Sequence, residues 1–429
     1  MDPRKSRLSH TTRRRMLKTT GGLTALGIIG NSATTPVAAD PGTEQWAFET
    51  SNIRSSPTIV DGTVLVGSAD DHLYAVDAAT GKQEWAFETD RWQSVNSSPT
   101  VVDGTVFVGS HDHHLYAVDA TTGEKQWAVE TGDKVGSSPT VVDETVFVGS
   151  WDTNLYAVDA ATGDQGWTFE TDDWIQSSPT VVDGTVFVGS GDSHLHAIDA
   201  TTGEQEWVFE TGDSVFSSPT VVNGTVFVGS VDTNLYAVDA ATGDQEWIFE
   251  TADSVLSSPT VVNGTVFVGS NDHHLYAVNA KTGDEQWAVE TGEAIYSSPT
   301  VADGTVFVGS IDNNLYALSA ETGEEQWVVE TGSAVFSSPT VVDGTVFVGS
   351  ADDNLYALAA GVEGSSEGSR VDLGTLGHRG DWQYADQSIT YRAESEGTDS
   401  VPGFGAGSGI TAIGATGYLL KRRIKHDSE

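Results

Sequence analysis

The histidines are the first residues of this sequence that could do chemistry, because neutral imidazole is a common ligand of transition metals. His111, His113 and His114 lie close together, and His273 and His274 form a second group. Both groups occupy the same place in a segment that occurs eight times in the chain, and the second group lies four copies after the first. In a ring of eight copies they would lie on opposite sides, so we predict no metal site.

One aspartate stands at the same loop position in all eight copies, where carboxylates could also hold cations. A carboxylate in such a loop usually accepts backbone N–H bonds and thereby holds the turn. We therefore expect a structural role, with a ring of cation sites as the alternative. These residues are Asp70, Asp112, Asp152, Asp192, Asp232, Asp272, Asp312 and Asp352.

The serines do not indicate nucleophilic catalysis. A Ser-Ser-Pro-Thr segment begins at Ser55, Ser97, Ser137, Ser177, Ser217, Ser257, Ser297 and Ser337, which makes eight copies. A catalytic serine would be singular, whereas these serines recur in every copy. We predict no catalytic residue.

The residues that differ between copies gather in two loops of the repeat. One loop precedes each Ser-Ser-Pro-Thr, and the other surrounds the recurring aspartate. Exposed aromatic clusters tend to mark binding surfaces, so we predict a ligand- or partner-binding face; the alternative is that these side chains only plug the ring. The face consists of Arg91, Trp92, Trp151, Trp174, Phe216, Leu256, Tyr296 and Phe336.

The repeat itself predicts the fold. The copies are spaced by 42 residues once and by 40 residues six times, a period that suits propeller blades of four strands. In one copy we expect strands at Ser98–Val102, Thr105–Gly109, Leu115–Asp119 and Gln126–Glu130, with a tight turn at Asp103-Gly104. We predict an all-β, eight-bladed β-propeller of four-stranded blades.

The two ends of the repeat region indicate how the ring closes. Glu44–Thr50 copies the fourth strand but precedes the first Ser-Ser-Pro-Thr, and the eighth copy ends at Gly361 without a fourth strand. We therefore expect the N-terminal strand to complete the last blade and to close a propeller of residues 40–361.

The segment A-x-D-x-x-T-G-x-x-x-W, as in Ala117, Gly123 and Trp127, resembles the docking motif of pyrroloquinoline-quinone-like (PQQ-like) propellers. The resemblance implies an eight-bladed ring in which each tryptophan packs between neighbouring blades. The corresponding tryptophans are Trp46, Trp85, Trp127, Trp167, Trp207, Trp247, Trp287 and Trp327.

The resembling family includes quinoprotein dehydrogenases, a propeller lipoprotein of bacterial outer-membrane assembly, and sensor domains without quinone. The dehydrogenases are longer, interrupt their repeats with insertions and often carry adjacent cysteines. This chain has regular spacing and no cysteine, so it resembles the non-catalytic members more.

The acidic net charge of the chain predicts that the protein works in concentrated salt. Residues 40–420 contain 59 acidic and 9 basic residues, a net charge of −50. Charge of one sign opposes compaction unless it is screened, and in about 1 M salt the Debye length is only about 3 Å. We expect a halophilic, haloarchaeal protein, with a calcium-binding acidic surface protein as the alternative. Such a surface excludes nucleic acid as a partner.

The N-terminal residues 1–39 resemble a twin-arginine (Tat) signal peptide. Arg13 and Arg14 begin a T-R-R-x-M-L-K pattern, a short apolar stretch follows, and Val37-Ala38-Ala39 offers a cleavage site. We expect export of the folded protein; an ordinary basic N-terminus is the alternative.

The C-terminal residues predict attachment to the cell surface. Residues 362–401 are rich in Gly, Ser and acid and indicate a flexible stalk. In residues 402–429, Pro402, Gly403 and Phe404 precede a short apolar run and a basic cluster. This order resembles the archaeal PGF sorting signal, which an archaeosortase replaces with a lipid; a permanent transmembrane helix is the alternative.

Three N-x-S/T acceptors for N-glycosylation occur at Asn96, Asn223 and Asn263. Asn223 and Asn263 replace aspartate in hairpin turns, where turn chemistry alone would explain them.

The sequence thus predicts an exported, surface-anchored, monomeric propeller that binds a surface protein or a small ligand without catalysis. Its contact with the membrane would be the C-terminal anchor, and no cofactor is expected. One alternative is a quinoprotein dehydrogenase that uses PQQ and calcium, and another is a purely structural role in the surface layer.

Overall fold

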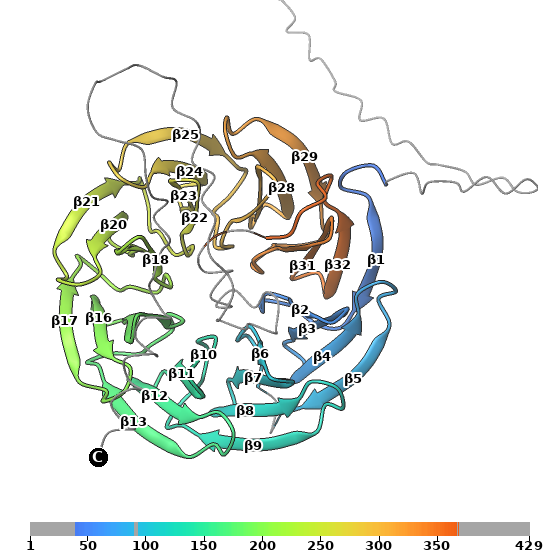
Figure 1. Cartoon of the computed structure of the whole chain (residues 1–429). Helices are drawn as coiled ribbons and strands as arrows, with labels where there is room; N and C mark the ends of the chain where they lie inside the picture. The colour runs from blue at the N-terminus through green and yellow to red at the C-terminus, as the bar shows by residue number, and fades with distance from the viewer. Residues whose placement is uncertain (1–38, 90–92, 367, 369–429) are drawn as a thin grey trace, which may run out of the picture. The chain divides into compact units, whose positions relative to one another are not determined.

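The computed structural model describes residues 39–89, 93–366 and 368. These residues form thirty-two strands in eight four-stranded antiparallel sheets, and they contain no helix long and apolar enough to cross a membrane. We call each sheet a blade and number the blades in chain order from the first Ser-Ser-Pro-Thr. Figure 1 shows the blades around a common axis, with the first strand of each blade innermost and the fourth outermost. The predicted all-β, eight-bladed propeller is confirmed.

Blades 1 to 4 each follow one continuous segment of the chain. Their strands are β2 (Thr58–Val60), β3 (Thr63–Gly67), β4 (His72–Asp77) and β5 (Gln83–Glu88); β6 (Thr100–Val102), β7 (Thr105–Ser110), β8 (His114–Asp119) and β9 (Lys125–Glu130); β10 (Thr140–Val142), β11 (Thr145–Gly149), β12 (Asn154–Asp159) and β13 (Gln165–Glu170); β14 (Thr180–Val182), β15 (Thr185–Gly189), β16 (His194–Asp199) and β17 (Gln205–Glu210).

Blades 5 to 7 follow the same order, and blade 8 takes its fourth strand from the start of the chain. Their strands are β18 (Thr220–Val222), β19 (Thr225–Gly229), β20 (Asn234–Asp239) and β21 (Gln245–Glu250); β22 (Thr260–Val262), β23 (Thr265–Gly269), β24 (His274–Asn279) and β25 (Glu285–Glu290); β26 (Thr300–Ala302), β27 (Thr305–Gly309), β28 (Asn314–Ser319) and β29 (Glu325–Glu330); β30 (Thr340–Val342), β31 (Thr345–Gly349), β32 (Asn354–Ala359) and β1 (Glu44–Glu49).

The first strand of each blade is shorter than the sequence predicted. In blade 2 it covers Thr100–Val102, whereas we expected it to begin at Ser98. Pro99 has no N–H to give to a ladder, and the N–H of Ser98 donates to Ser138 Oγ of the next blade at 2.9 Å. The serine and proline therefore bond between blades and cannot extend the strand.

This serine bond recurs at every blade boundary and forms a closed belt, which we call the serine belt. The N–H of the second serine donates to the hydroxyl of the second serine in the next blade. The last link runs from the N–H of Ser338 to Oγ of Ser56, at 3.1 Å. A parallel belt joins each threonine hydroxyl to the next proline carbonyl and closes from Thr340 to Pro57, at 2.6 Å. The identical Ser-Ser-Pro-Thr segments are therefore structural.

The apolar core lies between blades. In one cluster Leu73 and Trp85 of blade 1 pack with Val106 and Tyr116 of blade 2. Each docking tryptophan also donates its indole N–H to a backbone carbonyl of the next blade; Trp85, for example, bonds to Ala120 O at 3.0 Å. The same bond, at 2.9 to 3.1 Å, is made by Trp46, Trp127, Trp167, Trp207, Trp247, Trp287 and Trp327.

The N-terminal strand closes the ring, as the sequence predicted. β1 pairs antiparallel with β32, and Trp46 lies opposite Ala357, the same register that Trp167 and Ala157 have in blade 3. Gly42, at φ 75°, takes the place of the motif glycine: a Cβ there would lie 3.3 Å from Cε3 of Trp327. The chain before β1 thus supplies the missing turn as well as the missing strand.

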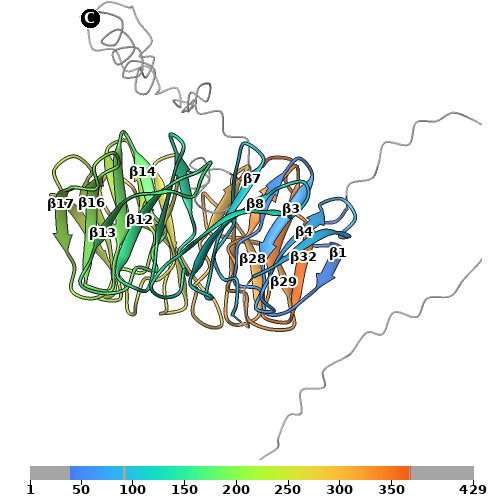
Figure 2. The same cartoon turned by 90° about the horizontal axis from the view of Figure 1, so that it is seen from below.

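The chain after β32 returns to the innermost strand of its own blade. The N–H of Ser366 donates to Val341 O at 2.8 Å, and the N–H of Val341 donates to Ser366 Oγ at 2.8 Å. Ser366 therefore bonds to β30, although the sequence places the start of the stalk at residue 362. Seen edge-on in Figure 2, the loops between strands lie on two opposite faces of the ring.

Candidate functional site

The recurring loop aspartates hold the site's scaffold. In blade 3, Asp152 Oδ1 accepts the N–H of Asn154 at 3.0 Å, and Oδ2 accepts the Tyr156 hydroxyl at 2.7 Å. Oδ2 also accepts the N–H of Gly132, which follows the last strand of blade 2. Burial, the hydrogen bond and the negative charge of Asp152 raise the pKa of Tyr156. The carboxylate thus fastens two blades and its own turn together, which is the structural role that we expected.

The two variable loops lie side by side on one face. The N–H of Trp151, in the aspartate loop of blade 3, donates to Lys134 O in the loop that enters that blade, at 2.9 Å. The same bond joins Gly191 to Trp174 O at 2.9 Å in blade 4. These bonds bring the variable residues of separate loops together.

Three of the predicted binding residues make one continuous row. The rings of Trp151 and Trp174 meet edge to face, with centroids 4.5 Å apart. Trp174 meets Phe216 in the same manner at 4.9 Å. All three side chains are half-buried, and edge-to-face pairs of this kind hold rings in fixed orientations. The row crosses blades 3, 4 and 5.

Glycines make room for this row. A Cβ on Gly191 would lie 2.6 Å from Trp174 Cδ1, and one on Gly136 would lie 3.2 Å from Trp151 Nε1. Other copies carry larger residues at both positions, such as Ile311 and Phe216. The two tryptophans therefore fit here because their neighbours lack side chains.

A second aromatic pair lies on blades 7 and 8. Tyr296 and Phe336 are stacked, with ring centroids 5.9 Å apart. Both immediately precede a Ser-Ser-Pro-Thr segment, as do Phe216 and Leu256. We use the name aromatic face for Trp151, Trp174, Phe216, Leu256, Tyr296 and Phe336.

Cations border the aromatic face, although the ring is strongly acidic. Lys134 Nζ lies over Trp151, 4.7 Å from the ring centroid, and the guanidinium carbon of Arg54 lies 4.6 Å from that of Phe336. Such cation–π contacts fix a charge against a ring. His111 contacts Trp151 with ring centroids 5.4 Å apart. Burial lowers the pKa of His111 to about 4, and the charges of Lys134 and Arg54 contribute.

Arg54, His111 and Lys134 lie in the two variable loops, but the predicted face did not include them. Arg54 occupies the same repeat position as Phe216, and His111 the same position as Trp151. Comparing the copies position by position would have found both. Lys134 has the same signal, because it occupies the repeat position of Trp174.

Several predicted residues lie outside the described part of the chain. They are Arg13, Arg14, Arg91, Trp92, Pro402, Gly403 and Phe404. Of the predicted glycosylation acceptors, Asn223 and Asn263 are exposed in hairpin turns at φ 52° and 50°, and Asn96 is half-buried.

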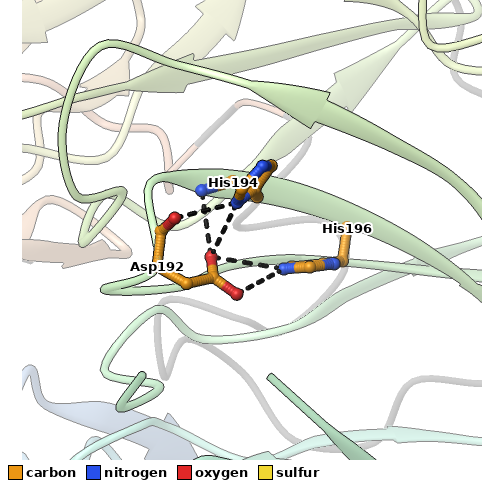
Figure 3. A group of neighbouring side chains, drawn as sticks. All are labelled: Asp192, His194 and His196. Carbon is orange, nitrogen blue, oxygen red and sulfur yellow. Dashed lines mark hydrogen bonds and ion pairs between the residues drawn. The ribbon is translucent and has the colours of Figure 1, made fainter. Parts of the chain in front are cut away.

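Two histidines and one aspartate converge in blade 4 of the described chain. Asp192, His194 and His196 bring ligand-type atoms within 4.8 Å of one another (Figure 3). Burial opposes ionisation of Asp192, but the hydrogen bond and the charge of His196 lower the pKa of its carboxyl. Sequence reasoning missed His196, and it predicted no metal site. The groups around His111 and His273 remain apart, on blades 2 and 6.

Comparison with known proteins places the repeats in a family. A family model described as outer membrane protein assembly factor BamB, of the PQQ-type repeat, matches residues 32–135, 112–221, 211–298 and 289–388. The chain belongs to this family. None of the curated proteins that we compared with it is significantly similar.

Solved structures share the fold of this PQQ-like propeller at low sequence identity. BamB from Moraxella catarrhalis is 21% identical with a TM-score of 0.65, and the match covers 74% of this chain and 97% of BamB. The designed protein Ika8 is 17% identical with a TM-score of 0.67, covering 74% and 100%. Quinohemoprotein alcohol dehydrogenase from Comamonas testosteroni is 16% identical with a TM-score of 0.63, covering 78% and 80%.

Proposed function

We propose that this propeller is a non-catalytic binding scaffold whose aromatic face holds a surface protein or a small ligand. One observation carries the proposal: the residues that differ between otherwise near-identical blades meet on one face, where Trp151, Trp174 and Phe216 form a row. Half-buried aromatic side chains bordered by cations supply apolar area and charge in the same place. The opposite ends of the strands carry near-identical turns in every blade.

Site-specific photo-crosslinking on the intact cell surface tests this proposal. A photoreactive residue at Gln176, an exposed position beside Trp174, should give a crosslinked species of defined mass. The matched control is the same residue at Asn223, an exposed turn elsewhere in the repeat. Equal crosslinking from both positions, or none from Gln176, would contradict the proposal.

The alternative is a PQQ- and calcium-dependent dehydrogenase, because a solved quinohemoprotein alcohol dehydrogenase has a similar fold. Calcium prefers oxygen ligands, whereas the group of converging ligands in the described chain contains two imidazoles. This group therefore does not suit calcium. Calcium-dependent, saturable quenching of tryptophan fluorescence by PQQ would establish the alternative.

We also propose that the ring is exported and anchored on the outer face of the cell membrane. Support comes from the Tat-like pattern at Arg13 and Arg14 and from the motif Pro402-Gly403-Phe404. Deleting residues 402–404 should release the protein from the membrane or change the mass of its mature C-terminus. An unchanged mass together with unchanged retention would exclude the sorting signal.

A further inference from the structure

One position breaks the repeat inside an otherwise uniform strand. The third strand of seven blades carries a tyrosine whose hydroxyl bonds the loop aspartate, as Tyr276 bonds Asp272 at 2.8 Å. Blade 4 has His196 at this position. Its Nε2 lies 3.1 Å from Oδ2 and 3.4 Å from Oδ1 of Asp192. Blade 4 has thus exchanged a phenol for a nitrogen ligand.

His194 brings a second imidazole to the same carboxylate. Figure 3 shows both rings beside Asp192, with His194 Nδ1 2.8 Å from the Asp192 carbonyl oxygen and 3.3 Å from Asp192 Oδ1. The Asp192 and His196 side chains are buried, with 6% and 8% exposed, whereas 33% of His194 is exposed. Solvent therefore reaches the cluster beside His194, whereas Asp192 and His196 are buried.

The spacing suits a small divalent cation. Ligand atoms about 2.0–2.2 Å from a tetrahedral zinc ion lie about 3.3 Å from one another. The carboxylate lies at about that distance from each imidazole, and the exposed His194 ring can adjust the third separation. Two imidazoles and one carboxylate suit Zn²⁺, Ni²⁺ or Cu²⁺, whereas Ca²⁺ and Mg²⁺ prefer oxygen ligands.

The surroundings already orient the ligands. Gln205 Oε1 lies 3.4 Å from His196 Nδ1 and can accept its N–H. Without a metal, Nε2–H donates to Asp192 at 3.1 Å, and a bound metal ion would take the place of that proton. The N–H of Asp172 donates to Asp192 Oδ2 at 3.2 Å. Partners that fix the far side of a ligating group are typical of metal sites.

We propose that Asp192, His194 and His196 form a binding site for one divalent transition-metal ion. Water completes the coordination on the exposed side of His194. The site is independent of the proposed scaffold function, although Gly191 joins it to Trp174 of the aromatic face.

Titration of the full-length chain, purified without a histidine tag, with Zn²⁺ tests this proposal. Molar salt and excess Ca²⁺ occupy the acidic surface, and calorimetry measures affinity and stoichiometry. The decisive variant is His196→Tyr, which restores the residue of the other seven blades and should fold. We expect one Zn²⁺ per chain and a dissociation constant at least about 100-fold higher in the variant.

Two blade 6 variants complete the test, because that blade has Asp272, His274 and Tyr276 in the equivalent places. His274→Asn should leave zinc binding unchanged, and Tyr276→His should add a second zinc ion. Equal affinity of wild type and His196→Tyr would overturn the proposal. An equal loss of zinc affinity in His274→Asn would also overturn it. If Tyr276→His binds only one zinc ion, an aspartate and two histidines in these places are not sufficient to form a site.

Discussion

At the scale of single residues, the repeat acts as its own reference. Trp151, His196 and His111 each stand where other blades carry a different residue, and each lies in a cluster that the common pattern does not form. The pattern explains why a blade forms, and the departures from it mark where blades differ in chemistry. Both candidate sites contain such departures.

His111 should make stability depend on pH. Its pKa falls from 6.5 to about 4 in the folded chain, chiefly through burial, whereas the unfolded chain still takes up the proton near pH 6.5. The stabilising contribution is therefore complete above pH 6.5 and is lost as the pH falls to about 4. We expect the melting temperature of His111→Gln to fall less than that of wild type between pH 7 and pH 4.5.

The control for this measurement is His113→Gln, in the same loop with a 45% exposed side chain. It should retain the wild-type difference between the two pH values. Parallel curves for wild type and His111→Gln would refute the assignment to His111.

At the scale of elements, the sequence predicted the strands well where the burial of apolar side chains determines them. The runs V-F-V and L-Y-A-V are buried in β7 and β8, as their apolar character indicated. It failed at Ser98 and Pro99, because the sequence does not show that their backbone groups bond to the next blade. The same limit applied to the aromatic face: its members were predicted, but the row from Trp151 to Phe216 needed the loop geometry.

The serine belt gives a testable energetic consequence. Ser218→Ala removes the acceptor of the buried Ser178 N–H, and an unsatisfied buried donor costs about 1–3 kcal/mol. We expect the free energy of unfolding in denaturant to fall by about that amount. Ser333→Ala, in the loop between blades 7 and 8, is the control and should change it by less than about 0.5 kcal/mol. Equal effects of the two variants would mean that the belt adds no stability.

At the scale of the whole molecule, the stability of the closed ring depends on the closing strand β1. Without residues 39–50, β32 becomes an exposed edge of its sheet. The Trp327 indole can still donate to the Ala360 carbonyl, because neither residue is removed. Exposed edges invite pairing with other chains. We expect the truncated chain to melt at a lower temperature and to self-associate in light scattering.

A synthetic peptide of residues 39–54, added in trans, should restore the melting temperature. The same peptide with Trp46→Ala is the control, because it lacks the indole that bonds Ala78 O. Restoration by both peptides would show that Trp46 docking is dispensable. An unchanged melting temperature on truncation would show that the ring does not need β1.

Net charge predicts a salt requirement for the ring. With −50 over residues 40–420, repulsion reaches about 30 Å in 0.01 M salt but only about 3 Å in 1 M salt. We expect the melting temperature, followed by circular dichroism, to rise steeply between 0.1 and 2 M KCl. A chain that melts at the same temperature throughout would contradict the halophilic interpretation.

The pairing of β1 with β32 also has a consequence during synthesis. Gln45 of β1 donates a side-chain N–H across β32 to the Thr345 hydroxyl of β31, 300 positions along the chain. At about 5–20 residues per second, the ribosome needs roughly 15–60 s to make that stretch. The first of the described strands to leave the ribosome is therefore the last to pair, because β1 cannot pair before β32 has been synthesised. The ring can therefore close only in a chain that has been synthesised through β32, because a shorter chain leaves β1 unpaired.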